Sequence, residues 1–570
     1  MKVKKIFLLL LFLPLFSIAK EYKVSSLNGK IVIEEESGLL FQGDIESFFK
    51  NLKNKDNIFF RRGDAFNISV SIKNKENIFL GSFGEKSLPK PKITSISPIP
   101  FEENENFEIF YSENKKADLN DSSFKNLILE FDRHYSILST STKRQISKEF
   151  EEVKDFIDYI LRIKLPTEKF RYFDPNALRV WLKNKEILRL MLFEELKCKE
   201  CKEETRWFFE KKEGYLYLFI RGEIKNIQEL KEDLKINNLY LDTISIQNSK
   251  NIIIRDLQIE GGKYAIALRG TSKTSISDSI IGKGSFVGVE IANSIDSNAS
   301  SDFNIIENCK IDSGFYFSYR FHSSRGSQDG IFLLGRANFN TISNNTISNW
   351  GHSGINLYSP QNGKVSNNYF VANKIEGSKV PYMHGFSMDG KNTSYNRFTS
   401  NIFTNLGARN QLNGVENAVY RNYFANIYNS QIKKDQGYGS GQAIWLQSYG
   451  DNACKNNYVT ENIFINCDEA AVSIVSYEKD GIKTKNTISG NFIINCGTKI
   501  FNKPYQNCVF EIFDEKGGTV KENNFVNNKI FNRETEPKVF YRGEILSIEE
   551  FNKKIGTNGD FIVGNKNLKK

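Results

Sequence analysis

A short phrase, N-x-[IF]-x-N, recurs through the second half of this chain and limits what the chain can fold into. It appears as NTISN from Asn345, NIFTN from Asn401, NYFAN from Asn422, NIFIN from Asn462 and NFIIN from Asn491, with a looser NYFVAN from Asn368. The opening Asn residues, taken in chain order, lie 23, 33, 21, 40 and 29 positions apart. A repeat of roughly 20 to 50 residues indicates a solenoid, a propeller or a repeat array.

A second strand-like phrase follows each copy: a small residue, then apolar, polar and apolar residues. Examples are GINLY, GFSMD, AIWLQ and AVSIV, and similar phrases, YAIALRG, VGVEIA and DGIFLL, precede them in the chain. Such alternation predicts short strands with one set of side chains inside and the other outside. A recurring Asn can form a ladder of amide hydrogen bonds between stacked coils. Because neither a leucine-rich repeat nor antiparallel hairpins are visible, the sequence predicts an all-β parallel β-helix, whose longer repeats carry loops.

The N-terminal third carries a resemblance to a known family. DNIFFRRGDAF from Asp56 precedes SIKNKENIFLGSFGEKSLPKPKITS, and RVWLKNKEILR from Arg179 and TRWFFEKKEGYLYLF from Thr205 follow. With the coils, these segments resemble the right-handed parallel β-helix proteins of the pectate-lyase-like superfamily, over roughly residues 40–100 and 170–530. The resemblance implies a secreted, polysaccharide-active β-helix. It leaves the reaction open, because that superfamily includes lyases, hydrolases, epimerases and non-enzymatic adhesins.

The patterns divide the chain into five segments. We expect a signal peptide over 1–19, the start of the β-helix over 20–102, a mixed α/β insertion or cap over 103–235, coils over 236–530 and a C-terminal cap over 531–570. Apolar residues at helical spacing predict an amphipathic helix over Phe150–Ile163. Three long inserts, Asp312–Gln328, Lys374–Met383 and Tyr428–Gly441, recur at one corner of the coil. Inserts of this kind would wall a groove on the binding face.

The N-terminus and the charge suggest where the protein works. Lysines precede a short apolar run that ends in small residues at Ala19, which is typical of a signal peptide and predicts a secreted or periplasmic protein. No later segment is apolar enough to span a membrane. Without Lys2, Lys4 and Lys5 the net charge falls from +10 to +7, which suits an acidic polysaccharide, although scattered solvated lysines explain it equally well. No compact basic block indicates nucleic acid, and we expect a monomer.

The seven cysteines permit disulfides without specifying them. The pair Cys198 and Cys201 lacks the second ligand pair that a zinc site needs, so a local disulfide or free thiols are favoured. Cys467 and Cys496 occupy equivalent positions in successive coils and are expected to be stacked, buried thiols.

Aligning the second phrases predicts which side chains meet. The first apolar residue of each serves as its anchor: Ile266, Val289, Ile331, Ile355, Phe386, Leu412, Ile444 and Val472. In this register His352 and His384 come from neighbouring coils, with Asp329 on one side and Arg409 on the other. The position after each anchor faces outward and reads Glu290, Phe332, Asn356, Ser387, Asn413, Trp445 and Ser473; two residues further come Leu334, Tyr358, Asp389, Val415 and Gln447.

This polar face, with Tyr358 and Trp445 exposed, predicts a glycan site, because sugars need hydroxyl and amide partners and an aromatic plate. The predicted substrate contacts are Asn356, Ser387, Asp389, Asn413, Trp445, Gln447, Glu416 and, in an insert, His322. Ordinary solvent-facing strand residues are the alternative interpretation.

The reaction that these residues favour is β-elimination on a uronate. It needs a cation, a base and an acid, and Arg409, His384 or His352, and Tyr358 supply them. Many relatives use Ca²⁺ held by aspartates, but no coil shows a compact acidic cluster for it. No other cofactor is expected.

Two other classes stay open. A glycoside hydrolase would use a carboxyl pair drawn from Asp329, Asp389, Glu416 and Glu469. A non-catalytic glycan-binding or adhesion protein would use the same face without chemistry. The structural alternative for His352 and His384 is that they only hydrogen-bond turn backbone. His134, outside the coils, has no assigned role.

Overall fold

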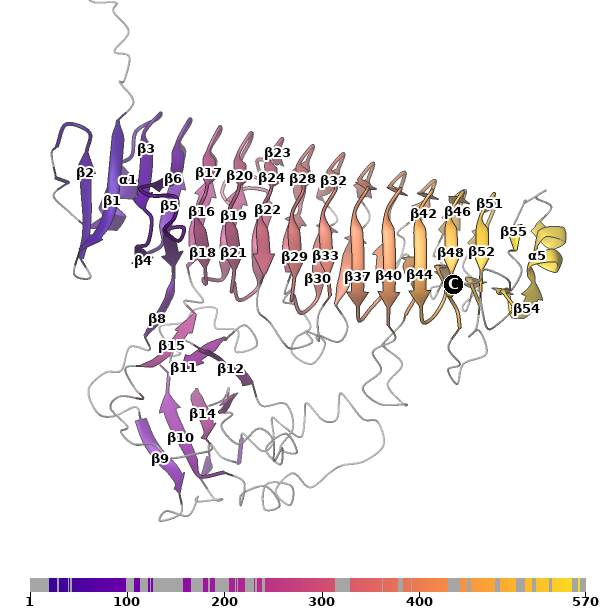
Figure 1. Ribbon diagram of the computed structural model, residues 1–570, viewed down its shortest axis with the longest axis horizontal. Helices are drawn as coiled ribbons and strands as arrows, with labels where there is room; N and C mark the ends of the chain where they lie inside the picture. Colours follow the sequence, from indigo (N-terminus) through magenta and orange to yellow (C-terminus); the bar gives the residue numbers. More distant parts are fainter. Residues whose placement is uncertain are drawn as a thin grey trace, which may run out of the picture.

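The computed structural model describes residues 20–27, 30–38, 40–41, 44–98, 107–112, 121–122, 125–126, 157–165, 178–182, 185–189, 205–210, 212, 214–220, 230, 233–237, 241–312, 329–360, 362–377, 383–390, 392–428, 441–447, 453–476, 482–498, 508–514, 519–532, 536–555 and 562–563. Most of them wind through three long, mostly parallel sheets, here named A, B and C (Figure 1). The predicted parallel β-helix is therefore confirmed.

Each coil runs through sheet C, a short sheet D where present, sheet A and then sheet B. Sheet C comprises β5 (Val70–Lys73), β16 (Ile244–Gln247), β19 (Tyr264–Arg269), β22 (Val287–Ala292), β26 (Asp329–Leu334), β30 (Ser353–Ser359), β34 (His384–Gly390), β38 (Asn410–Leu412), β41 (Ile444–Leu446), β45 (Val472–Ser476), β49 (Phe510–Asp514), β53 (Lys538–Tyr541) and β54 (Glu544–Ser547).

Sheet A comprises β2 (Lys30–Glu35), β1 (Glu21–Leu27), β3 (Asn57–Arg61), β6 (Phe79–Phe83), β17 (Ile253–Arg255), β20 (Ser275–Ser277), β24 (Ile305–Glu307), β28 (Thr341–Ser343), β32 (Tyr369–Val371), β36 (Arg397–Thr399), β39 (Ala418–Tyr420), β43 (Tyr458–Thr460), β47 (Thr487–Ser489) and β51 (Asn524–Val526). Sheet D has two parts: β23 (Ser301–Asp302), β27 (Arg336–Asn338), β31 (Lys364–Ser366) and β35 (Thr393–Ser394); then β42 (Ala453–Lys455), β46 (Ile482–Thr484) and β50 (Thr519–Lys521).

Sheet B comprises β4 (Ala65–Asn67), β7 (Lys92–Thr94), β18 (Gln258–Glu260), β21 (Ile280–Gly282), β25 (Lys310–Asp312), β29 (Thr346–Ser348), β33 (Lys374–Glu376), β37 (Ile402–Leu406), β40 (Tyr423–Ile427), β44 (Ile463–Cys467), β48 (Phe492–Ile494), β52 (Lys529–Phe531) and β55 (Ile562–Val563). Helices α1 (Ile45–Asn51) and α5 (Ile548–Ile555) lie near the two ends of the coil stack.

Two asparagine ladders hold the coils in register. The first lies at the turn between sheets A and B and comprises Asn345, Asn373, Asn401, Asn422, Asn462, Asn491 and Asn528. Each buried amide donates to a backbone carbonyl of an earlier coil, and each except Asn528, the last, also donates to the Oδ1 atom of the next Asn. The second ladder, between sheets D and A, comprises Asn304, Asn340, Asn368, Asn396, Asn417, Asn457, Asn486 and Asn523. The predicted ladder is present, but the sequence prediction missed its duplication.

Members of the first ladder lie 28, 28, 21, 40, 29 and 37 residues apart. The predicted spacings of 23 and 33 were wrong because the opening Asn368 of NYFVAN belongs to the second ladder. The closing Asn of the other phrases has a different task. Asn349, Asn405, Asn426, Asn466 and Asn495 all adopt positive φ, which Asn tolerates better than most residues, and so turn the chain.

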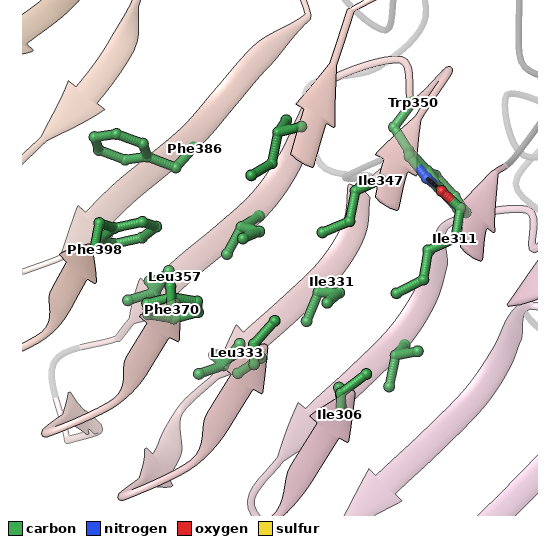
Figure 2. Close-up of a cluster of buried hydrophobic side chains, with 14 of the residues drawn as sticks. Ile306, Ile311, Ile331, Leu333, Ile347, Trp350, Leu357, Phe370, Phe386 and Phe398 are labelled. Atoms are coloured by element: carbon green, nitrogen blue, oxygen red, sulfur yellow. Dashed lines mark hydrogen bonds between the residues drawn. The ribbon is translucent and has the colours of Figure 1, made fainter. Parts of the chain in front are cut away.

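The interior is apolar along its length. Figure 2 shows Ile331, Leu333 and Leu357 of sheet C facing Ile306 and Phe370 of sheet A. The rings of Phe370 and Phe398 stack at 4.3 Å between centroids, and Phe398 stacks on Phe386 at 4.5 Å. Cys467 and Cys496 lie buried and unbridged within this core, as the stacked-thiol interpretation predicts. Cys198 and Cys201 lie outside the described residues.

The RRGD segment fastens the start of the chain to the first coils. Asp64 accepts from Arg61 Nε at 3.0 Å and from the Ser26 amide at 2.6 Å. Arg62 and Lys90 both pair with Asp256, at a turn of the coil that contains β17. These residues are therefore structural.

Between sheet B and the next coil an inserted sheet of eight strands departs from the coil stack: β8 (Ile96–Pro98), β15 (Leu234–Asn237), β11 (Val180–Leu182), β12 (Lys185–Arg189), β13 (Arg206–Glu210), β14 (Tyr215–Ile220), β10 (Tyr159–Lys164) and β9 (Phe107–Ser112). The predicted helix over Phe150–Ile163 is wrong where it is described, because Tyr159–Lys164 pairs as a strand with β14 and β9. Ile160, Leu161 and Ile163 are buried, so tertiary packing overrode the helical spacing.

The predicted inserts all fall between a strand of sheet B and the next strand of sheet C. Within the second of them, Lys374–Glu376 is strand β33, so that loop is shorter than predicted. Residues 313–328, 378–382 and 429–440 lie outside the described residues, as does the predicted signal peptide. No helix in the described part of the chain is long and apolar enough to cross a membrane.

Replacing a ladder asparagine should destabilise the fold. Asn462→Ala leaves the backbone N–H of Asn422 without its acceptor and the carbonyl of Val419 without its donor, and the Asn422 side chain loses one of its three acceptors. We expect a loss of about 2–4 kcal/mol in unfolding free energy, at about 1–3 kcal/mol per buried group left unpaired. Urea unfolding followed by circular dichroism measures it.

Asn466→Gly is the matched control within the same phrase. Asn466 is exposed at a φ of 53°, which glycine adopts readily, so the change should cost less than about 1 kcal/mol. Equal unfolding midpoints for the two variants would contradict the role given to the ladder.

Candidate functional site

Glycines shape the corner where strands of sheet C begin. Each of Gly330, Gly354 and Gly385 follows a polar residue and points its missing side chain into the core. A Cβ on Gly330 would lie 2.6 Å from the Gly354 carbonyl oxygen and from Ile347 Cγ2, and one on Gly354 would lie 2.7 Å from Ile375 Cγ2. Only glycine fits at these positions. The polar residues before them, such as Asp329, therefore lie on the same outer surface as Asn356.

Asp329 and His352 form a hydrogen-bonded pair at this corner. The Asp329 carboxylate is fully buried and accepts from His352 Nδ1 at 2.8 Å, from the Ser353 amide at 3.0 Å and from Asn356 Nδ2 at 2.8 Å. With Nδ1 as the donor, the lone pair of the imidazole is on Nε2, and the His352 side chain keeps 24% of its surface exposed. This is the arrangement of an oriented general base.

His384 adjoins the pair from the next coil. Its ring centroid lies 5.4 Å from that of His352, edge to face, and its amide donates to the His352 carbonyl at 2.7 Å. Its Nδ1 hydrogen-bonds to the Arg409 carbonyl. The guanidinium of Arg409 lies over the Trp445 ring. The register thus correctly placed both histidines and Asp329 together, with Arg409 beside them.

Asp389 belongs to the same group. Its Oδ2 accepts from Ser387 Oγ at 3.3 Å and its Oδ1 from Gln411 Nε2 at 2.8 Å. Burial raises the pKa of Asp389; the nearby Asp329 carboxylate raises it further, and His352 opposes both. Tyr358 lies opposite Asp389 in the register and is 42% exposed. Asp389, a carboxyl with a raised pKa, thus lies within electrostatic reach of His352, and the Tyr358 phenol lies on the strand beside Asp389.

The predicted register is right through Phe332, Asn356 and Ser387 and then fails by two residues. The anchor of the next coil is Asn410, opposite Ile444, and not Leu412. Gln411 therefore occupies the outward position that was predicted for Asn413, and Asn413 occupies the position that was predicted for Val415. Val415 itself lies outside sheet C, where it pairs with Ser394 and Lys455.

An asparagine can occupy the inward anchor because backbone groups satisfy its amide. Asn410 Oδ1 accepts from the Phe386 amide at 2.9 Å, and its Nδ2 donates to the Ala443 carbonyl at 2.8 Å. Anchors chosen by hydrophobicity alone missed it, and with it the role of Gln411. The polar run NQLNG was the available signal.

Three other predicted contacts do not join the site. Trp445 was predicted to be exposed but is 2% exposed, because it packs with Val475, Cys508 and Phe540 beneath Arg409. Glu416 lies at the turn between sheets D and A, where it hydrogen-bonds to Tyr395 and raises the pKa of that phenol. His322 lies outside the described residues, as does His134.

The sequence shows no compact acidic cluster for the calcium that many relatives use. In the described part of the chain, no three His, Cys, Asp or Glu side chains gather closely enough to hold a metal ion. Both carboxylate oxygens of Asp329 accept hydrogen bonds from side chains of the protein.

Comparison with known proteins adds little to the chemistry. No family model matches this chain, and no curated protein matches it. Among solved structures, XylC with xylose aligns at 12% identity with a TM-score of 0.36, over 95% of this chain and 82% of that one. The catalytic domain of GH87 alpha-1,3-glucanase in complex with nigerose aligns at 14% identity and 0.40, over 58% of this chain and 57% of its own. Endo-xylogalacturonan hydrolase from Aspergillus tubingensis aligns at 13% and 0.30, over 51% and 75%.

These structural neighbours include carbohydrate-active enzymes. At such identities and TM-scores, nothing about the reaction of this chain follows from them.

The raised pKa of Asp389 predicts a stability change with pH. The folded protein holds this proton more tightly than the unfolded chain, so ionisation of Asp389 lowers stability as the pH rises from the ordinary aspartate range through the raised pKa. Asn cannot ionise, so Asp389→Asn should gain melting temperature relative to the wild type between about pH 3 and pH 7.

Thermal unfolding at a series of pH values measures this gain. Asp296→Asn, which changes an exposed aspartate paired only with Lys73, is the control and should show little such trend. A difference between Asp389→Asn and wild type that stays constant with pH would contradict the prediction.

Proposed function

We propose that the protein cleaves a uronate-containing polysaccharide by β-elimination on the outer face of sheet C. The observation that carries the proposal is the buried Asp329 carboxylate on His352 Nδ1. His352 Nε2 would remove the proton next to the uronate carboxyl group, and Asp329 would stabilise the imidazolium that forms. The bond to the leaving oxygen breaks as the carbon–carbon double bond forms.

The neighbouring groups supply the other two roles. Arg409, which adjoins His384 through its backbone, carries the charge that would neutralise the uronate carboxylate. Tyr358, exposed opposite Asp389, offers the O–H that would protonate the leaving oxygen. Asn356 and Ser387, which lie opposite each other on adjacent strands, would contact hydroxyl groups of the substrate.

Hydrolysis is the second candidate because the raised pKa of Asp389 suits a general acid. It needs a second carboxylate in reach of water or substrate. Asp329 is fully buried, with three protein donors on its two oxygens, and Glu416 lies at another corner of the coil. Asp329 and Glu416 are therefore poorly suited to that role, which favours elimination.

We also propose export of the protein. The N-terminal sequence is typical of a signal peptide, and a polysaccharide too large to enter a cell must be met outside it. The net charge of +7 without the lysines of that segment suits an acidic polymer.

His352→Ala should lower kcat by about 10²-fold to 10⁴-fold, the usual contribution of a positioned general base. The assay follows the ultraviolet absorbance of the unsaturated product over a panel of uronate polymers. Asp329→Asn should show a similar loss, because an amide accepts poorly and no longer fixes the tautomer of His352.

Glu416→Gln is the control, since this carboxylate lies away from the site and the variant should retain activity. New reducing ends without the unsaturated product would reject elimination in favour of hydrolysis. Full activity of His352→Ala would reject the assignment of the base.

A further inference from the structure

Amide side chains along the outer face of sheet C have buried polar atoms with no hydrogen-bond partner among the residues that the structure describes. Four such atoms lie between β30 and β41: Asn356 Oδ1, Asn413 Nδ2, Gln442 Oε1 and Gln447 Oε1. Their residues are at most 5% exposed. Buried polar groups are nearly always paired, so a run of unpaired ones on one face indicates a partner that the chain does not supply.

The orientation of three of these amides is fixed by their other atom. Asn356 Nδ2 donates to Asp329 at 2.8 Å, and Gln442 Nε2 donates to Glu511 at 3.2 Å, which leaves an oxygen unpaired in each. Asn413 Oδ1 accepts from the Gly414 amide at 2.6 Å, which leaves its Nδ2 unpaired. The row therefore presents two defined acceptors and one defined donor, a set that sugar hydroxyl groups can satisfy in both senses.

The row runs from the proposed catalytic group toward the C-terminal coils. Asn413 lies two residues after Gln411, which hydrogen-bonds to Asp389. Gln447 occupies the equivalent position on the next coil, two residues after Trp445, because Trp445 lies opposite Gln411 in the register. Ser473 and Glu511 continue the outward column, and Ser473 Oγ donates to Glu511 at 2.7 Å.

Little in this row can pair with a second anionic sugar. Strands β30, β34, β38, β41, β45 and β49 contain no Lys or Arg, and among the described residues Arg409, which the proposed reaction already uses, lies beside them. The amides are neutral, and Glu511 adds a carboxyl group. Burying a carboxylate without a cation is costly, whereas a neutral sugar needs only hydrogen bonds.

On the N-terminal side the same corner is occupied by protein. Phe286 lies in the column of His352, two coils away, and packs against the core of the inserted sheet. Asn237 of β15 donates to the Lys283 carbonyl at 3.1 Å and to Ser285 Oγ at 2.6 Å. In Figure 1 the inserted sheet lies beside these N-terminal coils. A bound chain thus has its polar partners on the C-terminal side.

We propose that the substrate is a mixed polysaccharide whose uronate is followed by neutral sugars, bound at Asn413, Gln442 and Gln447 on the C-terminal side of His352. This rests on the proposed function for the uronate and adds the class of the neighbouring units. The neutral units accept from Asn413 Nδ2 and donate to the oxygens of Gln442 and Gln447.

The first test compares two polymers of the same uronate, one a homopolymer and one alternating with neutral sugars. We expect kcat/KM at least about 10-fold higher on the alternating polymer, the discrimination that one or two buried hydrogen bonds give. Gln447→Ala removes an oxygen that has no partner among the described residues and should raise KM on the alternating polymer about 10-fold with kcat nearly unchanged. A homopolymer cleaved as fast or faster would overturn the proposal.

The second test measures binding without catalysis, by calorimetric titration of neutral oligosaccharides into the full-length protein. Binding should weaken about 10-fold in Gln447→Ala and in Asn413→Ala. It should be unchanged in Ser245→Ala, which lies in the same outward column at the N-terminal end of sheet C. Melting curves check that each variant is folded.

The outcomes separate the two proposals. Retained, Gln447-dependent binding of neutral sugars with no cleavage of any polymer would reject elimination and support the neutral subsites. Equal affinity in Gln447→Ala, Asn413→Ala and wild type, or no binding of any neutral oligosaccharide, would assign these amides to ordered water and overturn the inference.

Discussion

The hydrogen bond from one asparagine amide to the next is the interaction on which this structure depends. A coil of a β-helix must change direction several times, and each turn exposes backbone groups to an apolar interior. The ladder amides solve this locally: Asn401 donates to Asn422 and to the Phe370 carbonyl, while its oxygen accepts from Asn373. Each turn thereby fixes the height of the next, at the strand spacing of about 4.8 Å. Loops of very different length can then be inserted without shifting the strands, as the 21-residue and 40-residue separations show.

Fixed register is what makes a site possible on sheet C. Strand alternation turns every second side chain outward, and stacking places Asn356, Ser387 and Gln411 in one column across three coils. The glycine column adds a second set of outward residues at the corner, which include Asp329 and His384. Because no side chain can replace Gly330 or Gly354, the approach of Asp329 to His352 is set by the backbone and not by flexible loops.

The features that depend on the sequence repeat were predicted correctly, and those that depend on individual hydrogen bonds were missed. The β-helix, the ladder and the meeting of Asp329, His352 and His384 follow from repeats that can be counted. The second ladder is visible in the sequence as the spacing N-x-x-x-x-N, for example Asn396 and Asn401, but the prediction used only the N-x-[IF]-x-N phrase. Asn410 was missed because a polar side chain was not expected at an inward position. Two backbone hydrogen bonds, which cannot be read from the sequence, satisfy its amide. The strand over Tyr159–Lys164 was missed because its partners, β14 and β9, lie far away in the chain.

The burial of Asp329 bears most directly on the chemistry. The Asp329 carboxylate already accepts hydrogen bonds from His352, Ser353 and Asn356, so it has little capacity left to attack a sugar or to activate water. It is well placed to orient the His352 imidazole. The carboxyl with the raised pKa, Asp389, is held instead by the neutral donors Ser387 and Gln411. Two aspartates two coils apart thus have different surroundings: Asp329 accepts from three donors of the protein, whereas burial raises the pKa of Asp389. The difference follows from the coil position that each aspartate occupies: Asp329 lies at the corner where its strand begins, and Asp389 lies further along its strand.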